Sequence, residues 1–214
     1  MAAVALGRDF VFKVGAPEVC PTGVAQVDAL AGGLPQGCLT EVYGPASSGR
    51  TSVMLAALAQ STSRENLCAL VDTCDAFDPA SAAPAGVRLE RLLWVRCGGN
   101  AEHALKATDL LVQGGGFGLV ALDLADTPDA TARRISMTSW FRLRRAVEHT
   151  PTVLLVLEQR PHARTCASLT LEMRRENAAW SGAPGCSRLL RGIRVRAERR
   201  KPMPALAASF ESRW

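Results

Sequence analysis

The sequence lacks the features that define several large classes of protein. No apolar run approaches the ~18 residues needed to cross a bilayer, and the first residues, MAAVALGRDF, have no basic segment followed by a long apolar core. The 7 cysteines are odd in number and form no C-x-x-C pair, which favours reduced thiols over a disulfide framework or a zinc site. The 3 histidines have no metal-ligand spacing. We therefore expect a cytoplasmic protein with no membrane partner, no secretory signal and no metal site.

The composition is that of one globular domain. The chain has 214 residues, of which 48% are hydrophobic and 21% are charged, so it can bury a sizeable core. The net charge is +5, and the basic residues gather in RLLRGIRVRAERRK, residues 188–201, where they could meet DNA phosphates or an acidic partner. The alternative is a solvated strand edge that its charges protect from aggregation. The candidate contacts are Arg194, Arg196, Arg199, Arg200 and Lys201.

Short apolar strands alternate with helical stretches, which predicts an α/β fold with a mainly parallel central sheet and helices on both faces. After residue 167 the apolar residues instead alternate singly with polar ones, as in 169–174 and 193–198. This change predicts antiparallel C-terminal strands added to the parallel sheet. We expect the earlier strands at 39–43, 67–71, 92–96, 119–122 and 152–157, and helices at 51–60, 101–113 and 131–148.

The stretch VYGPASSGRTS, residues 42–52, has the spacing of a phosphate-binding loop. Such a loop follows a strand and opens a helix, so that backbone N–H groups point at the phosphates. Thr51 is placed to hold a magnesium ion, and Arg50 stands where a lysine normally reaches the β- and γ-phosphates. The candidate cofactor is therefore ATP with magnesium, bound weakly. The candidate nucleotide-binding residues are Gly44, Pro45, Ala46, Ser47, Ser48, Gly49, Arg50, Thr51 and Ser52.

A longer stretch carries a family resemblance. GGLPQGCLTEVYGPASSGRTSVMLAAL, followed by LCALVDTCDAFDP, resembles the core of the RecA family of recombinases, and the similarity extends from about residue 22 to residue 211. The resemblance implies a RecA-type P-loop core at 22–214 and a role in bacterial DNA repair. It also implies that Asp123 is the Walker B aspartate and that Gln159 is a sensor glutamine. Residues 1–21 form an N-terminal segment whose strand, at 10–14, either docks on a neighbouring subunit or folds back on its own domain.

The departures from the family pattern concern catalysis. Arg50 replaces the lysine with a bulkier, planar cation. Cys74 stands where the family has the glutamate that orients the attacking water, and we expect the neighbouring Asp72 and Asp75 to point elsewhere. The DNA-binding loop that follows Gln159 is short, and the large N-terminal helix and the C-terminal domain of the recombinases have no counterpart. We therefore expect no catalytic residue and no ATP turnover.

Small RecA-like proteins with altered motifs are similar to the ImuA family, accessory proteins of bacterial translesion synthesis in the SOS response. That similarity implies a non-catalytic role in DNA damage tolerance beside a polymerase-like partner protein. DNA binding and self-association are further expectations. Two alternatives stay open: an active DNA-dependent ATPase of the RecA or RadA type, in which arginine does the lysine's work, and a SulA-like inhibitor of cell division.

Overall fold

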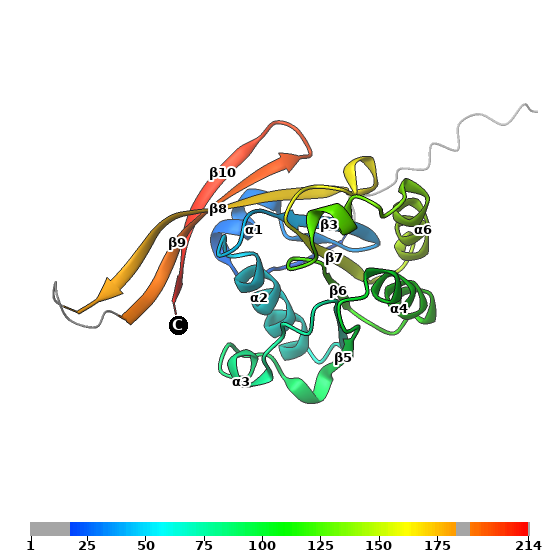
Figure 1. Ribbon diagram of the computed structural model, residues 1–214, viewed down its shortest axis with the longest axis horizontal. Helices are drawn as coiled ribbons and strands as arrows, with labels where there is room; N and C mark the ends of the chain where they lie inside the picture. Colours follow the sequence, from blue (N-terminus) through cyan, green and yellow to red (C-terminus); the bar gives the residue numbers. More distant parts are fainter. Residues whose placement is uncertain (1–17, 183–188, 214) are drawn as a thin grey trace, which may run out of the picture.

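An eight-stranded sheet organises the part of the chain that the structure, a computed structural model, describes, which is residues 18–182 and 189–213 (Figure 1). The predicted assembly strand at 10–14 lies outside these residues, as does most of the N-terminal segment. In chain order the elements are β1 (Val19–Cys20), α1 (Ala25–Ala31), β2 (Leu34–Pro35), β3 (Cys38–Tyr43), α2 (Arg50–Ser63), β4 (Cys68–Asp72), α3 (Pro79–Ala82), η1 (Leu89–Arg91), β5 (Leu92–Arg96), α4 (Ala101–Gly114), β6 (Leu119–Asp123), α5 (Asp129–Ala132), α6 (Met137–Val147), β7 (Val153–Glu158), η2 (Arg164–Cys166), β8 (Leu169–Ser181), β9 (Leu189–Lys201) and β10 (Leu206–Arg213).

The strands lie in the order β10-β9-β8-β3-β7-β6-β4-β5. The six strands from β8 to β5 are parallel, and β9 and β10 are antiparallel. The predicted α/β fold, with a mainly parallel sheet and antiparallel C-terminal strands, is therefore confirmed. Strand β8 is where the direction changes, because it runs parallel to β3 on one side and antiparallel to β9 on the other.

Strand β7 shows why the central strands read as unbroken apolar runs. Val153, Leu155 and Leu157 belong to a core cluster that also contains side chains of α1, α2 and α3. Leu154 and Val156 point to the opposite face, into a cluster formed with α4 and α6. Figure 1 shows these two groups of helices on opposite sides of the sheet. Because both faces are covered, the strand is apolar on each side, and each fully buried aliphatic side chain contributes roughly 1.5–3 kcal/mol.

The single helix predicted at 131–148 is wrong, because the structure has two helices there. The short helix α5 ends at Ala132, and α6 begins only at Met137. Ser136 caps the second helix, since its hydroxyl accepts a 3.1 Å hydrogen bond from the N–H of Ser139. This side-chain cap supplies a partner for one of the unpaired amides of a helix start. It also starts the helix at a position from which Trp140 is fully buried.

Strands β8 and β9 extend well beyond the rest of the sheet. Each is 13 residues long, but β3 pairs with only the first part of β8, from Leu169 to Glu172. The far ends of β8 and β9 pair with each other and form a projecting two-stranded ribbon, drawn in orange in Figure 1. In residues 18–182 and 189–213, none of the helices has the length and apolar character needed to span a membrane.

Candidate nucleotide site

The predicted phosphate-binding loop connects β3 to α2, as its spacing requires. Gly49 precedes the helix with φ 89°, a left-handed conformation that glycine adopts without strain. The first amides of α2 have no partner within the helix, so they are available to an anion at the loop. Ser48 adds a hydroxyl that is 1% exposed and has no hydrogen-bond partner among the described residues.

Strands β8 and β9 pack directly onto this loop. A Cβ atom at Gly44 would lie 2.2 Å from the carbonyl oxygen of Met173, and one at Gly49 would lie 2.7 Å from Val195. Both glycines are therefore required by close approach of the neighbouring strands. The space that remains over residues 47–52 is a pocket of about 150 Å³, closed on its other side by Arg175, Leu190 and Ile193. Ligand pockets usually measure about 300–1,000 Å³, so this one has room for a phosphate-sized group but not for a whole nucleotide.

A larger groove lies beside the small pocket. It has a volume of about 1060 Å³ and runs between helices α1, α2 and α3 and strands β9 and β10. Ser52 lines both spaces. A nucleotide with its phosphates at the loop would therefore have to extend from one space into the other.

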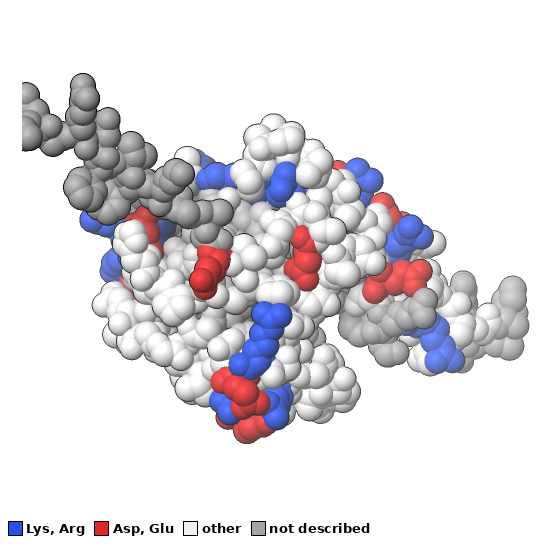
Figure 2. Space-filling model, turned by 180° about the vertical axis from the view of Figure 1, so that it is seen from behind, with Lys and Arg blue, Asp and Glu red and all other residues white. Residues whose placement is uncertain are grey.

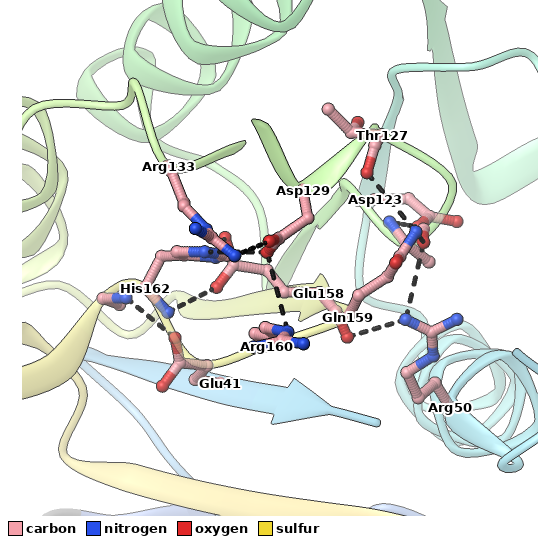
Figure 3. Close-up of polar contacts among 12 residues, drawn as sticks. Glu41, Arg50, Asp123, Thr127, Asp129, Arg133, Glu158, Gln159, Arg160 and His162 are labelled. Atoms are coloured by element: carbon pink, nitrogen blue, oxygen red, sulfur yellow. Dashed lines mark hydrogen bonds and ion pairs between the residues drawn. The ribbon is translucent and has the colours of Figure 1, made fainter. Parts of the chain in front are cut away.

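The side chain of Arg50 points toward Asp123 and Gln159 at the edge of the sheet (Figure 3). Its guanidinium donates a 2.7 Å hydrogen bond to the main-chain oxygen of Glu158 and a 3.5 Å bond to that of Ala125. Arg50 is 5% exposed, and burial lowers the pKa of its guanidinium, while the nearby Asp123 and Asp126 act in the opposite direction. Arginine stays protonated in proteins, so a positive charge is held against these two main-chain oxygens.

Asp123, the predicted Walker B aspartate, ends strand β6 at the same edge of the sheet. Burial, with the neighbouring carboxylates of Asp72 and Asp126, raises the pKa of Asp123 to about 6, while a 2.8 Å hydrogen bond from the N–H of Ala125 favours the charged form. Because one strand, β7, separates β6 from β3, this carboxylate is placed opposite the loop. Thr51 is exposed at the start of α2. Asp123 and Thr51 are thus the residues that would hold magnesium.

Cys74 follows β4 and lies at this edge as well, with its sulfur 3.9 Å from the hydroxyl of Thr127. Burial raises the pKa of the thiol, and the carboxylates of Asp126, Asp123 and Asp72 act in the same direction. A thiol with a raised pKa stays neutral at pH 7, so it cannot orient and polarise a water molecule as a carboxylate does.

The two acidic neighbours of Cys74 have structural partners. Asp72 accepts hydrogen bonds from the N–H groups of Ala76 and Phe77, at 3.1 and 2.9 Å, and from the indole of Trp94 at 3.2 Å. Asp75 pairs with Arg96 at 3.0 Å. Neither carboxylate is directed at the loop, as the sequence led us to expect.

Gln159, the predicted sensor, is tied to the segment that follows Asp123. Its amide donates to the main-chain oxygens of Ala125 at 3.1 Å and Thr127 at 3.4 Å. The oxygen of Ala125 therefore receives bonds from both Arg50 and Gln159 (Figure 3). Arg50 and Gln159 are thus linked through one carbonyl group.

Sequence reasoning missed a buried polar cluster next to Arg50. Glu41 and Glu158 are both 0% exposed and lie on the adjacent strands β3 and β7. Burial, with the neighbouring Glu158, raises the pKa of Glu41 to about 8. His162 lies between Glu158 and Asp129. The available signal was a glutamate inside each of two apolar strands, which is unusual for a buried face.

The predicted basic contacts all lie on β9, and each has a partner within the fold. Arg196 pairs with Glu198 at 3.1 Å, and Arg200 pairs with both Glu172 and Glu198 at 2.7 Å. Figure 2 shows basic and acidic side chains interspersed over the face that it displays. Strand β9 lies between β8 and β10, so the alternative of a strand edge is wrong. The contacts agree better with a charge-balanced surface of the sheet than with a continuous DNA-binding patch. The other three are Arg194, which pairs with Glu176, Arg199, which bonds the oxygen of Pro204, and Lys201, which bonds the oxygen of Ala167.

Comparison with known proteins gives a consistent result. Residues 2–132 match the RecA N-terminal domain. The RecA protein of Brucella anthropi is 38% identical over 127 residues, which cover 56% of this chain and 35% of that protein. The RecA of Deinococcus radiodurans is 37% identical over 126 residues, covering 56% and 34%, and that of Acinetobacter baumannii is 38% identical over 133 residues, covering 58% and 38%. The alignments thus span about a third of the length of these curated relatives.

Proposed function

Because the chain belongs to the RecA N-terminal domain family, we propose that it has the family's nucleotide-binding frame without its turnover. In this proposal it is a non-catalytic accessory protein of bacterial DNA damage tolerance, of the kind that the ImuA proteins represent in translesion synthesis. Its partners are a polymerase-like protein and DNA, and it self-associates. The activity of the RecA relatives is not proposed for this chain.

The observation that carries the proposal is the position of Arg50. Its guanidinium is buried and bonded to the main-chain oxygens of Glu158 and Ala125. To reach a phosphate at the loop, it would have to leave both carbonyl groups without this donor. Both oxygens keep another donor, the amide of Gln159 at Ala125 and the N–H of Gly44 at Glu158. What would be lost are the hydrogen bonds from the charged guanidinium, worth roughly 1.5–3 kcal/mol, and this loss favours the present position.

Cys74 supports the same proposal independently. Hydrolysis needs a base that orients water in line with the γ-phosphate, and such a base contributes about 10²–10⁴-fold to the rate. The neutral thiol does not supply one, and Asp72 and Asp75 are bonded elsewhere. The site therefore lacks a water-orienting base as well as the lysine that Arg50 replaces.

The residues that remain fit weak binding of ATP with magnesium. The loop amides would hold phosphate oxygens, and Thr51 and Asp123 would hold the ion, which neutralises phosphate charge when bound. The pocket of about 150 Å³ limits how deeply a nucleotide enters while β8 and β9 cover the loop. Binding without hydrolysis is the expected outcome.

Exposed apolar side chains on the ribbon support a role in binding other proteins. Trp180 is 51% exposed and Leu189 is 61% exposed, and both lie at the far end of the β8–β9 ribbon. Aromatic and aliphatic side chains on a projecting element are typical of a protein interface.

The proposal is tested in a bacterium that carries the gene, by deleting it and measuring mutation after DNA damage. We expect damage-induced mutagenesis to fall to the uninduced level, and a copy with Arg50→Ala to restore it, provided that this variant accumulates to the normal level. Loss of recombination instead of mutagenesis would favour the active ATPase. Cell filamentation on overexpression, with unchanged mutagenesis, would favour the SulA-like inhibitor.

A further inference from the structure

Four ionisable side chains from four segments of the chain meet beside the phosphate loop (Figure 3). Glu41 comes from β3, Glu158 from the end of β7, and Asp129 from the start of α5. His162 comes from the short loop that follows β7, residues 159–168. The 159–168 loop is thus joined to β3, β7 and α5 at one point.

The two glutamates hold the backbone of the 159–168 loop. Glu158 accepts a 3.1 Å hydrogen bond from the N–H of His162, and Glu41 accepts a 2.8 Å bond from the N–H of Ala163. The other oxygens of these carboxyl groups, Oε1 of Glu158 and Oε2 of Glu41, are buried without a hydrogen-bond partner among the described residues. Two such oxygens on neighbouring carboxyl groups can be satisfied together if one group carries a proton that the other accepts.

The imidazole of His162 links the glutamates to α5. Its Nδ1 lies 3.5 Å from Glu158, and its Nε2 lies 3.4 Å from Asp129. Both ring nitrogens therefore face a carboxylate oxygen, an arrangement that favours the doubly protonated imidazolium. Hydrogen bonding to Glu158 raises the pKa of His162, and burial opposes this.

Other charged groups surround the cluster. Arg133 faces both His162 and Asp129, and Arg160 faces Asp129. Burial raises the pKa of the Cys166 thiol, which faces Glu41 as well as Arg144 of α6 and Lys201 of β9. Among the described residues, none of these arginine and lysine side chains forms an ion pair with Glu41 or Glu158.

We propose that this chain of groups is a proton-dependent latch, which holds the 159–168 loop on the sheet edge while Glu41 and His162 are protonated and releases it when they lose their protons. Ionised Glu41 would repel Glu158, and both would be buried side by side without an ion pair to these arginine and lysine side chains. Neutral His162 would keep a donor for only one of its two carboxylates. Both changes loosen the same backbone.

Both groups have their pKa raised by folding, which fixes the direction of the effect. The stability that they contribute is fully present below the unfolded-state pKa of each group and is lost as pH rises through the folded-state value, which for Glu41 is about 8. Release is therefore expected on the alkaline side. Release of the loop would also affect the nucleotide site, because the main-chain oxygen of Glu158 accepts a hydrogen bond from Arg50.

Hydrogen exchange of the His162 and Ala163 amides tests the latch in the full chain, at about pH 6.5 and about pH 9, after correction for the intrinsic rate. In the unmodified protein, we expect protection to fall about tenfold between these values, the size expected when one hydrogen bond to a charged group is broken. Glu41→Gln cannot ionise, so only His162 still loses a proton, and the fall in protection should be clearly smaller than in the unmodified protein. The exposed Glu102→Gln on α4 is the matched control and should behave like the unmodified protein.

Equal protection at both pH values in the unmodified protein would overturn the proposal, and so would the same fall in Glu41→Gln. Should Glu41→Gln fail to fold by circular dichroism, His162→Gln decides. If the amides of the 159–168 loop in His162→Gln are poorly protected already at about pH 6.5, the latch is supported. If their protection equals that of the unmodified protein, the latch is contradicted.

Discussion

The loop at 44–49 and the strand ends that face it contribute differently to the nucleotide site. The loop provides a backbone shape, and the strand ends provide side chains. In the loop, backbone geometry is fixed by packing, since Gly44 meets Met173 and Gly49 meets Val195. At the strand ends, the side chains of Arg50 and Asp72 are used for bonds within the protein. The loop must keep its shape for the chain to fold, whereas the groups at the strand ends can change their chemistry without disturbing the sheet. Because packing requires these glycines, the motif would persist even in a chain without turnover, as we propose for this one.

The largest effect is expected from substitution in the loop. In Gly44→Ala the new Cβ would lie 2.2 Å from a backbone oxygen of β8, which cannot move without shifting the strand. We expect a loss of more than about 3 kcal/mol in the free energy of unfolding, measured with urea. Gly114→Ala at the end of α4 is the control, because a Cβ there meets nothing within 4 Å. Equal stability of the two variants would mean that β8 does not cover the loop.

A smaller effect is expected at the strand ends. Arg50→Ala leaves the main-chain oxygens of Glu158 and Ala125 without this donor, so we expect a loss of roughly 1–3 kcal/mol in unfolding free energy. The exposed Arg64, just after the same helix, serves as the control, and Arg64→Ala should stay within about 0.5 kcal/mol of the unmodified protein. If Arg50→Ala were as stable as Arg64→Ala, the guanidinium would be free to serve the phosphate pocket, and the contrast between the two regions would disappear.

The smallest effect on stability is expected from the arginines of β9. Arg196, Arg199 and Arg200 are exposed or half-buried, and ion pairs between exposed side chains, such as those of Arg196 and Arg200, contribute little to stability. In the triple variant, Arg196→Ala with Arg199→Ala and Arg200→Ala, we expect little change in melting temperature. We also expect weaker binding to single-stranded DNA at low salt, with the salt slope reduced by about 0.7 for each phosphate that is no longer neutralised. Unchanged binding would mean that these arginines form only a solvated, charge-balanced surface of β9.

The sequence predicted the order of elements well because burial on two faces leaves a strong periodic signal. Strands β5 and β7 were located to within a residue. Asp123 ends strand β6, and Cys74 follows strand β4. The continuous helix at 131–148 was wrong because Ser136, an ordinary polar residue in a sequence window, acts as a cap only in the folded chain.

The interior of the site could not be predicted. The direction in which Arg50 points depends on two main-chain oxygens from distant segments, and neither leaves a trace in the residue types. The cluster of Glu41, Glu158 and His162 depends on the pairing of β3 with β7, so residues far apart in the chain meet only in three dimensions. Likewise, the pairing of Arg200 with Glu172 depends on the register of β8 with β9.

The central claim, a nucleotide frame without turnover, is tested most directly by phosphate release from ATP with magnesium and single-stranded DNA. We expect no release above that of a matched sample without protein, because both Arg50 and Cys74 lack the chemistry that the step needs. Arg50→Lys alone should not restore release, since no residue would orient the water. DNA-stimulated turnover by the unmodified protein at the rate of a RecA recombinase, assayed beside it, would contradict the account.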